Sequence, residues 1–122
     1  MAENKQYITQ VQDNGRVMIS EDVISTIVFQ SLSDIEGYVG LSAKPGSDIV
    51  ELLGKKHWGK GIKVVISEND ELTIDCNVII SYGHSVVSVA NAIQEAVSGA
   101  LQSMTGVAVA SVNVNVCGIV RQ

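Results

Sequence analysis

The stretch that decides the fold runs from Ile79 to Val116, IISYGHSVVSVANAIQEAVSGALQSMTGVAVASVNVNV. Apolar residues recur in it at steps of three and four, which is the period of one face of an α-helix. Ser85 precedes this run and can accept a hydrogen bond from a free backbone N–H at the helix start. Gly106 follows the run and can adopt the left-handed conformation that ends a helix. The predicted helix therefore buries eight side chains: Val86, Val89, Ala90, Ile93, Val97, Ala100, Leu101 and Met104.

Strands are predicted on both sides of this helix. Residues 61–67 and 72–81 alternate between apolar and polar, and the polar turn 68–71 joins them into a hairpin. Residues 107–118 form a third strand of the same alternating type. Strands with a single apolar face suit a sheet that is covered by helices on one side only. The predicted inward residues are Leu72, Ile74, Cys76, Val78, Ile80, Ala108, Ala110, Val112, Val114 and Val116, and the outward ones are Thr73, Asp75, Asn77, Ser81, Ser111, Asn113, Asn115 and Cys117.

The N-terminal half repeats the order of strand, Ser-capped helix and glycine break. Residues 1–13 are polar with little periodicity, and we expect them to form a flexible N-terminal arm. A strand is predicted over 15–20 and a helix over 21–35, which Gly37 ends. A short strand over 38–41 follows.

These elements predict an α+β fold, a two-layer sandwich in which two main helices pack on one face of a small mixed or antiparallel sheet. The chain has 122 residues, enough for one domain with a real core, and we assign that domain to residues 14–122. Hydrophobic residues make up 46% of the chain and aromatic residues only 4%, so the core must be aliphatic.

Composition also limits the class of function. The net charge of −5 argues against a general nucleic-acid binder, which usually has a basic face. No apolar run approaches the roughly 18–20 residues that span a bilayer, and the N-terminus has no segment of signal-peptide type. Cys76 and Cys117 are compatible with a reducing compartment. We therefore expect a cytoplasmic protein.

One basic cluster lies in the irregular segment 42–60 and just after it. It consists of Lys55, Lys56, Lys60 and Lys63, together with His57 and Trp58, the only tryptophan. Such a group is a candidate contact for anionic headgroups or an acidic partner, and the alternative is a solvated loop with Trp58 folded onto the sheet edge. The glycine and lysine spacing resembles a phosphate-binding loop, but Gly61 stands where a Ser or Thr is required and a strand follows instead of a helix.

The remaining motifs predict no catalytic, cofactor or metal site. His57 and His84 are far apart and neither has zinc-ligand spacing. Ser85 is adjacent to His84, which is poor geometry for a nucleophile and its base, and Ser85 is needed as a helix cap. The Gly37-Tyr38-Val39-Gly40 sequence lacks the basic residues that a nucleic-acid clamp of this type exposes. We therefore expect a protein that is not an enzyme.

A set of motifs distributed over residues 14–120 resembles the alkaline shock protein family. In the first half these motifs are Gly15-Arg16-Val17-Met18-Ile19-Ser20 with Asp22-Val23-Ile24, and Glu36-Gly37-Tyr38-Val39-Gly40-Leu41. In the second half they are Gly61-Ile62-Lys63-Val64, Ile74-Asp75, Ser81-Tyr82-Gly83, Val89, Gln94-Glu95, Met104-Thr105-Gly106 and Val112-Asn113-Val114-Asn115-Val116-Cys117-Gly118.

The resemblance implies a small cytoplasmic protein of Gram-positive bacteria, linked to cell-envelope stress or homeostasis. Relatives of this kind self-associate, reach the membrane through a separate anchor protein, and have no established catalytic residues or cofactor. We therefore expect a homo-oligomer that docks to a membrane-anchored partner, with only indirect or peripheral membrane contact and no nucleic acid. The alternative is a cytoplasmic regulator of lipid metabolism that binds an acyl or anionic metabolite.

Overall fold

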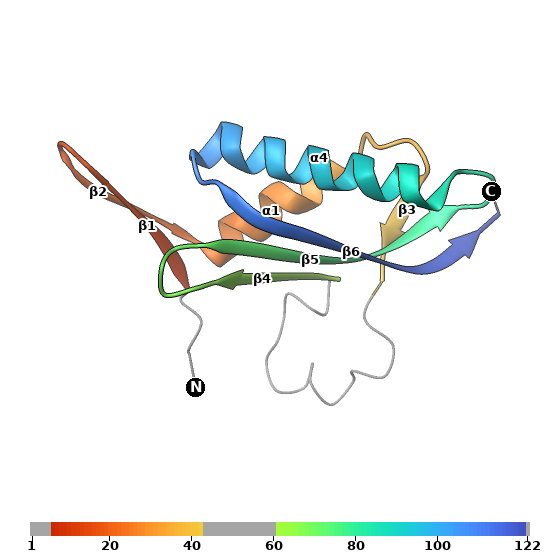
Figure 1. The fold of residues 1–122 in the computed structure, drawn as a ribbon, viewed down its shortest axis with the longest axis horizontal. Helices are drawn as coiled ribbons and strands as arrows, with labels where there is room; N and C mark the ends of the chain where they lie inside the picture. Colours follow the sequence, from red (N-terminus) through yellow and green to blue (C-terminus); the bar gives the residue numbers. More distant parts are fainter. Residues whose placement is uncertain (1–5, 43–60, 122) are drawn as a thin grey trace, which may run out of the picture.

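The structure is a computed structural model, and it describes residues 6–42 and 61–121 (Figure 1). The described chain forms two helices and six strands. These are β1 (Tyr7–Gln12), β2 (Gly15–Ser20), α1 (Glu21–Leu32), β3 (Tyr38–Leu41), β4 (Ile62–Ile66), β5 (Leu72–Ser81), α4 (Val86–Thr105) and β6 (Val109–Val120).

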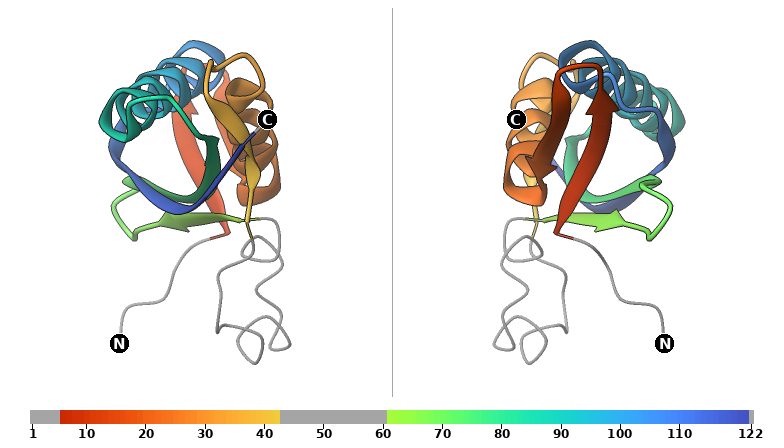
Figure 2. Two further views of the ribbon diagram at one scale, coloured as in Figure 1. Left: turned by 90° about the vertical axis from the view of Figure 1, so that its right-hand side faces the viewer. Right: turned by 90° about the vertical axis from the view of Figure 1, so that its left-hand side faces the viewer.

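Strand β5 is the centre of the main sheet. Strands β3 and β4 both pair with it antiparallel, β4 along its first half and β3 along its second half. Strand β6 pairs with β5 in parallel, and α4 makes the crossover between them. Figures 1 and 2 show α1 and α4 side by side on one face of this sheet, so the predicted α+β fold is confirmed.

Helix α4 follows the prediction closely. The hydroxyl of Ser85 accepts a hydrogen bond from the backbone N–H of Ser88 at 3.3 Å, as an N-cap does. At the other end, Gly106 is left-handed with φ 76°, and its N–H donates to the carbonyl of Gln102. Of the eight predicted apolar residues, Val86 and Met104 at the two ends stay exposed, and four are fully buried: Val89, Ile93, Val97 and Leu101.

Helix α1 begins where predicted and ends earlier. Ser20 accepts a hydrogen bond from the N–H of Val23 at 3.2 Å, and α1 stops at Leu32 instead of Ile35. Both the backbone N–H and the hydroxyl of Ser33 donate to the carbonyl of Gln30. These bonds join residues three apart, whereas an α-helix joins residues four apart. The α-helical hydrogen-bond pattern therefore ends here.

The core is aliphatic, as expected from composition. Alternate residues of β5 face the helices and are fully buried, in agreement with the predicted alternation. These are Leu72, Ile74, Cys76, Val78 and Ile80.

The expected flexible arm over residues 1–13 is wrong for 7–12, which form β1. Strand β1 pairs with β2 in a hairpin that projects past the C-terminal end of α4 (Figure 1). Ile8 is only 1% exposed because it fills the open end of the core. Two further bonds hold the hairpin base: the Thr9 N–H donates to Asp70, and the Gln10 side chain donates to the carbonyl of Thr105.

The last strand starts later than predicted and contains two irregularities. Ala108 lies outside β6, and both Ala108 and Ala110 are exposed instead of inward. The register with β5 shifts at Ala110 and again at Cys117, because each is an extra residue that no β5 residue opposes. Between these bulges, the predicted alternation from Ser111 to Val116 is confirmed.

Candidate functional site

The predicted basic cluster is represented in the structure by Lys63 alone. Lys55, Lys56, Trp58 and Lys60 lie outside the described residues, so the grouping of the cluster stays a prediction. Lys63 is half-buried in β4, directly opposite Asp75 of β5. Its place is therefore on the outer face of the main sheet, opposite the two helices.

A row of polar side chains crosses this outer face from β5 to β6, and we call it the amide row: Asp75, Asn77, Asn113 and Asn115. The side-chain amide of Asn113 donates to Asp75 Oδ1 at 2.8 Å, and that of Asn115 donates to Asn77 Oδ1 at 3.0 Å. Each bond joins residues that face one another in the parallel ladder. The amide row therefore links β6 to β5 by side-chain hydrogen bonds on the face that neither helix covers.

Asn77 corrects one expectation about this face. It was predicted to be solvent-exposed, yet it is completely buried, and its Nδ2 has no hydrogen-bond partner among residues 6–42 and 61–121. The backbone of Asn77 lies at the junction of β3 and β4. The N–H of Ser42 donates to the Asn77 carbonyl at 2.9 Å, and the Asn77 N–H donates to the Gly61 carbonyl at 2.8 Å.

The contact between Ser42 and Gly61 depends on glycine. Gly61 has φ 86°, and a Cβ at this position would lie 2.9 Å from both the Leu41 side chain and the Ser42 carbonyl oxygen. Ser42 and Gly61 are the two residues that flank segment 43–60. The segment that carries most of the basic cluster therefore leaves the sheet and returns to it at one point, next to Asn77.

The outer edge of β6 is the second feature of this region. Among the residues that the structure describes, β6 pairs only with β5. Its sequence, VASVNVNVCGIV, contains neither a charged residue nor a proline. Two carbonyls of the strand have side-chain partners: Gln94 Nε2 of α4 donates to the Val112 carbonyl at 2.9 Å, and the Cys117 thiol donates to the Asn115 carbonyl at 3.6 Å.

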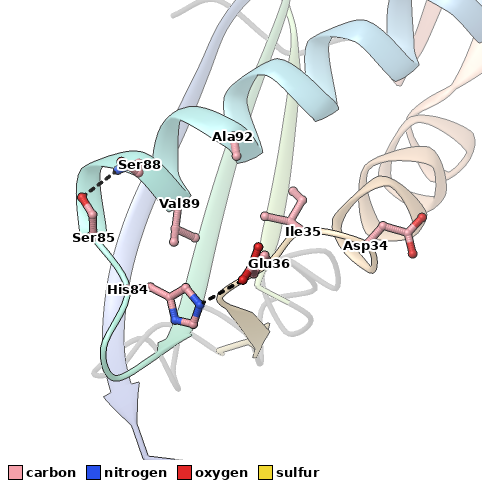
Figure 3. Close-up of a pocket in the computed structure, with 8 residues that line it drawn as sticks. All are labelled: Asp34, Ile35, Glu36, His84, Ser85, Ser88, Val89 and Ala92. Carbon is pink, nitrogen blue, oxygen red and sulfur yellow. Dashed lines mark hydrogen bonds and ion pairs between the residues drawn. The ribbon is translucent and has the colours of Figure 1, made fainter.

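A pocket of about 500 Å³ lies where the α1–β3 turn meets the start of α4 (Figure 3). Both His84 and Glu36 line it, with His84 Nε2 and Glu36 Oε2 3.8 Å apart, and Figure 3 shows the two side chains pointing toward one another. The Ser85 hydroxyl is occupied by the α4 cap, as predicted, so it is not paired with His84. The other residues that line the pocket are Asp34, Ile35, Ser88, Val89 and Ala92.

A second, apolar groove of about 270 Å³ runs between the two helices on their outer side. Ile27 of α1 and Ala100 and Met104 of α4 give it an apolar surface. Thr26, Gln30 and Ser31 form its polar border. A surface of this kind accepts hydrocarbon better than it accepts a charged group.

The two cysteines have opposite environments. Cys117 is exposed, whereas Cys76 is buried in the core. Burial, and secondly the neighbouring Asp75 charge, raises the pKa of the Cys76 thiol to about 12. The Cys76 thiol is therefore protonated near neutral pH and serves as a small apolar side chain.

Within residues 6–42 and 61–121, His, Cys, Asp and Glu nowhere gather in a group of three that could hold a metal ion. No helix in the described part of the chain is long and apolar enough to cross a membrane.

The alternation of β5 and β6 predicts the amide row as polar strand positions but does not predict its pairing. The available signal was the shared spacing of Asp75-x-Asn77 and Asn113-x-Asn115, which brings both pairs into register once β5 and β6 lie side by side. The Asn77 junction had no local signal, because Ser42 and Gly61 are distant from Asn77 in sequence.

Comparison with known proteins assigns the chain to a family. A family model described as the alkaline shock protein 23 family, with a cell envelope-related function, matches residues 9–121. The uncharacterized protein YqhY of Bacillus subtilis is 31% identical over 105 residues, covering 86% of this chain and 77% of that protein. The uncharacterized protein Spy1614 of Streptococcus pyogenes is 35% identical over 108 residues, covering 87% of this chain and 88% of that protein. No solved structure matches the chain significantly. The chain therefore belongs to the alkaline shock protein 23 family, whose function is related to the cell envelope.

Proposed function

We propose that this protein is a non-enzymatic module of cell-envelope homeostasis that self-associates and docks onto a membrane-bound partner protein. The observation that carries the proposal is the asymmetry of the main sheet. Both helices pack on one face, and the opposite face carries the amide row, which neither helix covers. The exposed members of the row, Asn113 and Asn115, are suited to recognising another protein surface, since a side-chain amide can both donate and accept hydrogen bonds, whereas Asn77 is buried.

The charges on this face favour a protein partner over a polyanion. Lys63 and Asp75 face each other across β4 and β5, so the described part of the face has no excess of either sign. Anionic lipid and nucleic acid are bound chiefly by clustered cations. We accordingly propose a cytoplasmic protein that reaches the membrane through its partner, with no nucleic-acid ligand and no cofactor.

Fractionation of the native host tests docking. An epitope-tagged chain is followed through membrane and cytosolic fractions, and crosslinking in living cells identifies what remains attached. Recovery with membranes after a high-salt wash, together with one integral membrane protein, is the expected result. Release by salt alone would assign the attachment to anionic lipid, and a wholly cytosolic protein without a crosslinked partner would contradict docking.

Two arginine variants locate the docking face. Thr73→Arg places a long cation on the outer face of β5 and leaves the sequence of β6 unchanged. Gln102→Arg makes a change of comparable size on the exposed side of α4 and serves as the matched control. Docking on the outer face predicts that only Thr73→Arg loses the membrane partner.

The apolar groove between α1 and α4 favours a second candidate function, the binding of an acyl chain. Thermal-shift measurements with fatty acids and acyl carriers test it, because a ligand at one hundred times its Kd stabilises the native state by about 2.7 kcal/mol. Met104→Glu should abolish the shift, since it places a charge in the groove. No shift with any acyl compound would reject this candidate.

A further inference from the structure

The outer edge of β6 has a self-complementary sequence. Between the two bulges the strand reads Ser-Val-Asn-Val-Asn-Val over residues 111–116, in unbroken register with Thr73–Val78 of β5. The order is the same in both directions about Val114: valines stand at 112 and 116, and asparagines stand at 113 and 115. Ser111 and Cys117, similar in size, extend the symmetry by one residue at each end.

Backbone groups along this edge are directed away from β5. The Val112 carbonyl accepts its hydrogen bond from Gln94 of α4, so it does not depend on the β5 ladder. Successive residues of a strand direct their N–H and C=O groups to opposite sides, so the groups of Val114 and Val116 share the direction of Val112. A carbonyl has two lone pairs, and the Val112 oxygen therefore retains one for a second donor.

We propose that β6 pairs antiparallel with β6 of a second copy of this chain about a twofold axis at Val114. This inference rests on the self-association in the proposed function and specifies its surface and register. Val114 faces Val114 of the second copy, and Val112 faces Val116. On the outer face, Asn113 faces Asn115 of the second copy, so the amide row continues across the axis.

Three observations select a second copy as the occupant of this edge. A twofold interface requires one patch to be complementary to itself, and the palindrome of residues 112–116, Val-Asn-Val-Asn-Val, meets that requirement. The strand carries no charge, so pairing two identical copies brings no like charges together. It also lacks the lysines and prolines that keep exposed strand edges apart.

The Val114→Pro variant tests the pairing of the backbones. Proline removes the N–H of Val114, which faces the second copy, while the ladder to β5 uses residues 111, 113 and 115. The self-association of the full chain is measured by sedimentation equilibrium from micromolar to millimolar concentration. We expect at least a tenfold weaker dimer, with circular dichroism and thermal melting showing that the variant is folded.

Charge pairs on the outer face test the register. Asn113→Lys/Asn115→Lys and Asn113→Glu/Asn115→Glu each place like charges opposite one another and should be monomeric. An equal mixture of the two should form a heterodimer, because every lysine then faces a glutamate. The variant Asn113→Lys/Asn115→Glu should form a homodimer, because its lysine then faces the glutamate of the second copy. In the alternative register, residue 113 faces residue 113, so two lysines would meet and prevent the dimer.

The outcomes separate this inference from the proposed function. A wild-type dimer that is unaffected by Val114→Pro and by both like-charge variants would overturn the β6 pairing and leave self-association through another surface. A wild-type chain that is monomeric at every concentration would overturn the pairing and the self-association together. Folded like-charge variants that stay monomeric when mixed would overturn the register.

Discussion

The imidazole of His84 rests directly on Gly37. A Cβ at Gly37 would lie 3.1 Å from His84 Cγ and 2.8 Å from the Val89 side chain, and Gly37 has φ 92°. The Gly37 carbonyl also accepts a hydrogen bond from the Ser81 N–H at 2.8 Å. This contact joins the turn after α1 to the turn before α4, next to the pocket that His84 and Val89 line.

Replacing Gly37 by alanine should destabilise the fold by about 2 kcal/mol or more. The left-handed backbone costs an L-residue about 1–2 kcal/mol, and overpacking against Val89 adds to this. Urea denaturation measures the free energy of unfolding. Gly40→Ala is the matched control, because a Cβ there meets no atom within 4 Å, and it should change stability by less than about 1 kcal/mol. Equal effects of the two substitutions would contradict the tight contact.

Replacing Ile8 by alanine should cost about 2–5 kcal/mol, as for other large side chains removed from a core. The result would show that β1 is part of the folded domain. Val11→Ala on the same strand is the control: Val11 is 85% exposed, and its loss should change stability by no more than about 0.5 kcal/mol. Hydrogen exchange of the β1 and β2 amides should also accelerate in Ile8→Ala. If Ile8→Ala were as stable as wild type, the hairpin would not be anchored in this way.

The two bonds of the amide row should differ in their contribution to stability. Asn115→Ala leaves the buried Asn77 Oδ1 without its donor, which costs about 1–3 kcal/mol. Asn113→Ala removes a shorter bond, 2.8 Å to Asp75 against 3.0 Å, but solvent can replace the lost amide at this exposed site, so the cost should be smaller. Chemical denaturation of both variants, performed at concentrations where each is monomeric, makes the comparison. A larger loss for Asn113→Ala would contradict the burial of Asn77.

Stability should fall as the pH rises above about 9. The pKa of Cys76 is raised to about 12 in the folded chain, mainly by burial, from an ordinary value of 9.0. Between these values the unfolded state loses its proton first, so alkali favours unfolding, with a slope of at most about 1.4 kcal/mol per pH unit from one group. Burial also raises the pKa of Tyr38, which contributes with the same sign.

Denaturation curves between pH 7 and pH 11 measure this slope. Cys76→Ala should reduce the slope whatever its stability at pH 7, and Cys117→Ser should preserve it because Cys117 is exposed. At pH 8, a thiol reagent should modify Cys117 in the native chain and leave Cys76 unmodified. An unchanged slope in Cys76→Ala would assign the alkaline sensitivity to other groups.

The local pattern of apolar residues was sufficient to predict the elements that bury one continuous face. Apolar residues recur at steps of three and four along α4 and at every second position along β5. Ser85 and Gly106 mark the ends of α4. Strand β1 was missed because Ile8 is the only fully buried residue in it. The turn composition Asp13-Asn14-Gly15 was the available signal, since such residues commonly join two strands of a hairpin.

Features created by distant parts of the chain could not be predicted in this way. Ser42 and Gly61 meet at the backbone of Asn77, and no periodicity encodes this junction. The shift of register at Cys117 likewise appears only when β6 is laid against β5. The basic cluster of Lys55, Lys56, Trp58 and Lys60 stays a prediction, and Lys63 is placed on the outer face.

The contact between Ser42 and Gly61 makes the main sheet independent of the length of the chain between them. Because these two residues already touch and both bond to Asn77, strands β3 and β4 are aligned whatever number of residues joins them. The junction of Ser42 and Gly61 is thus a point where the connecting chain can change in length while β3 and β4 keep their register with β5. A different peptide could be grafted at this position to give the same fold a new specificity.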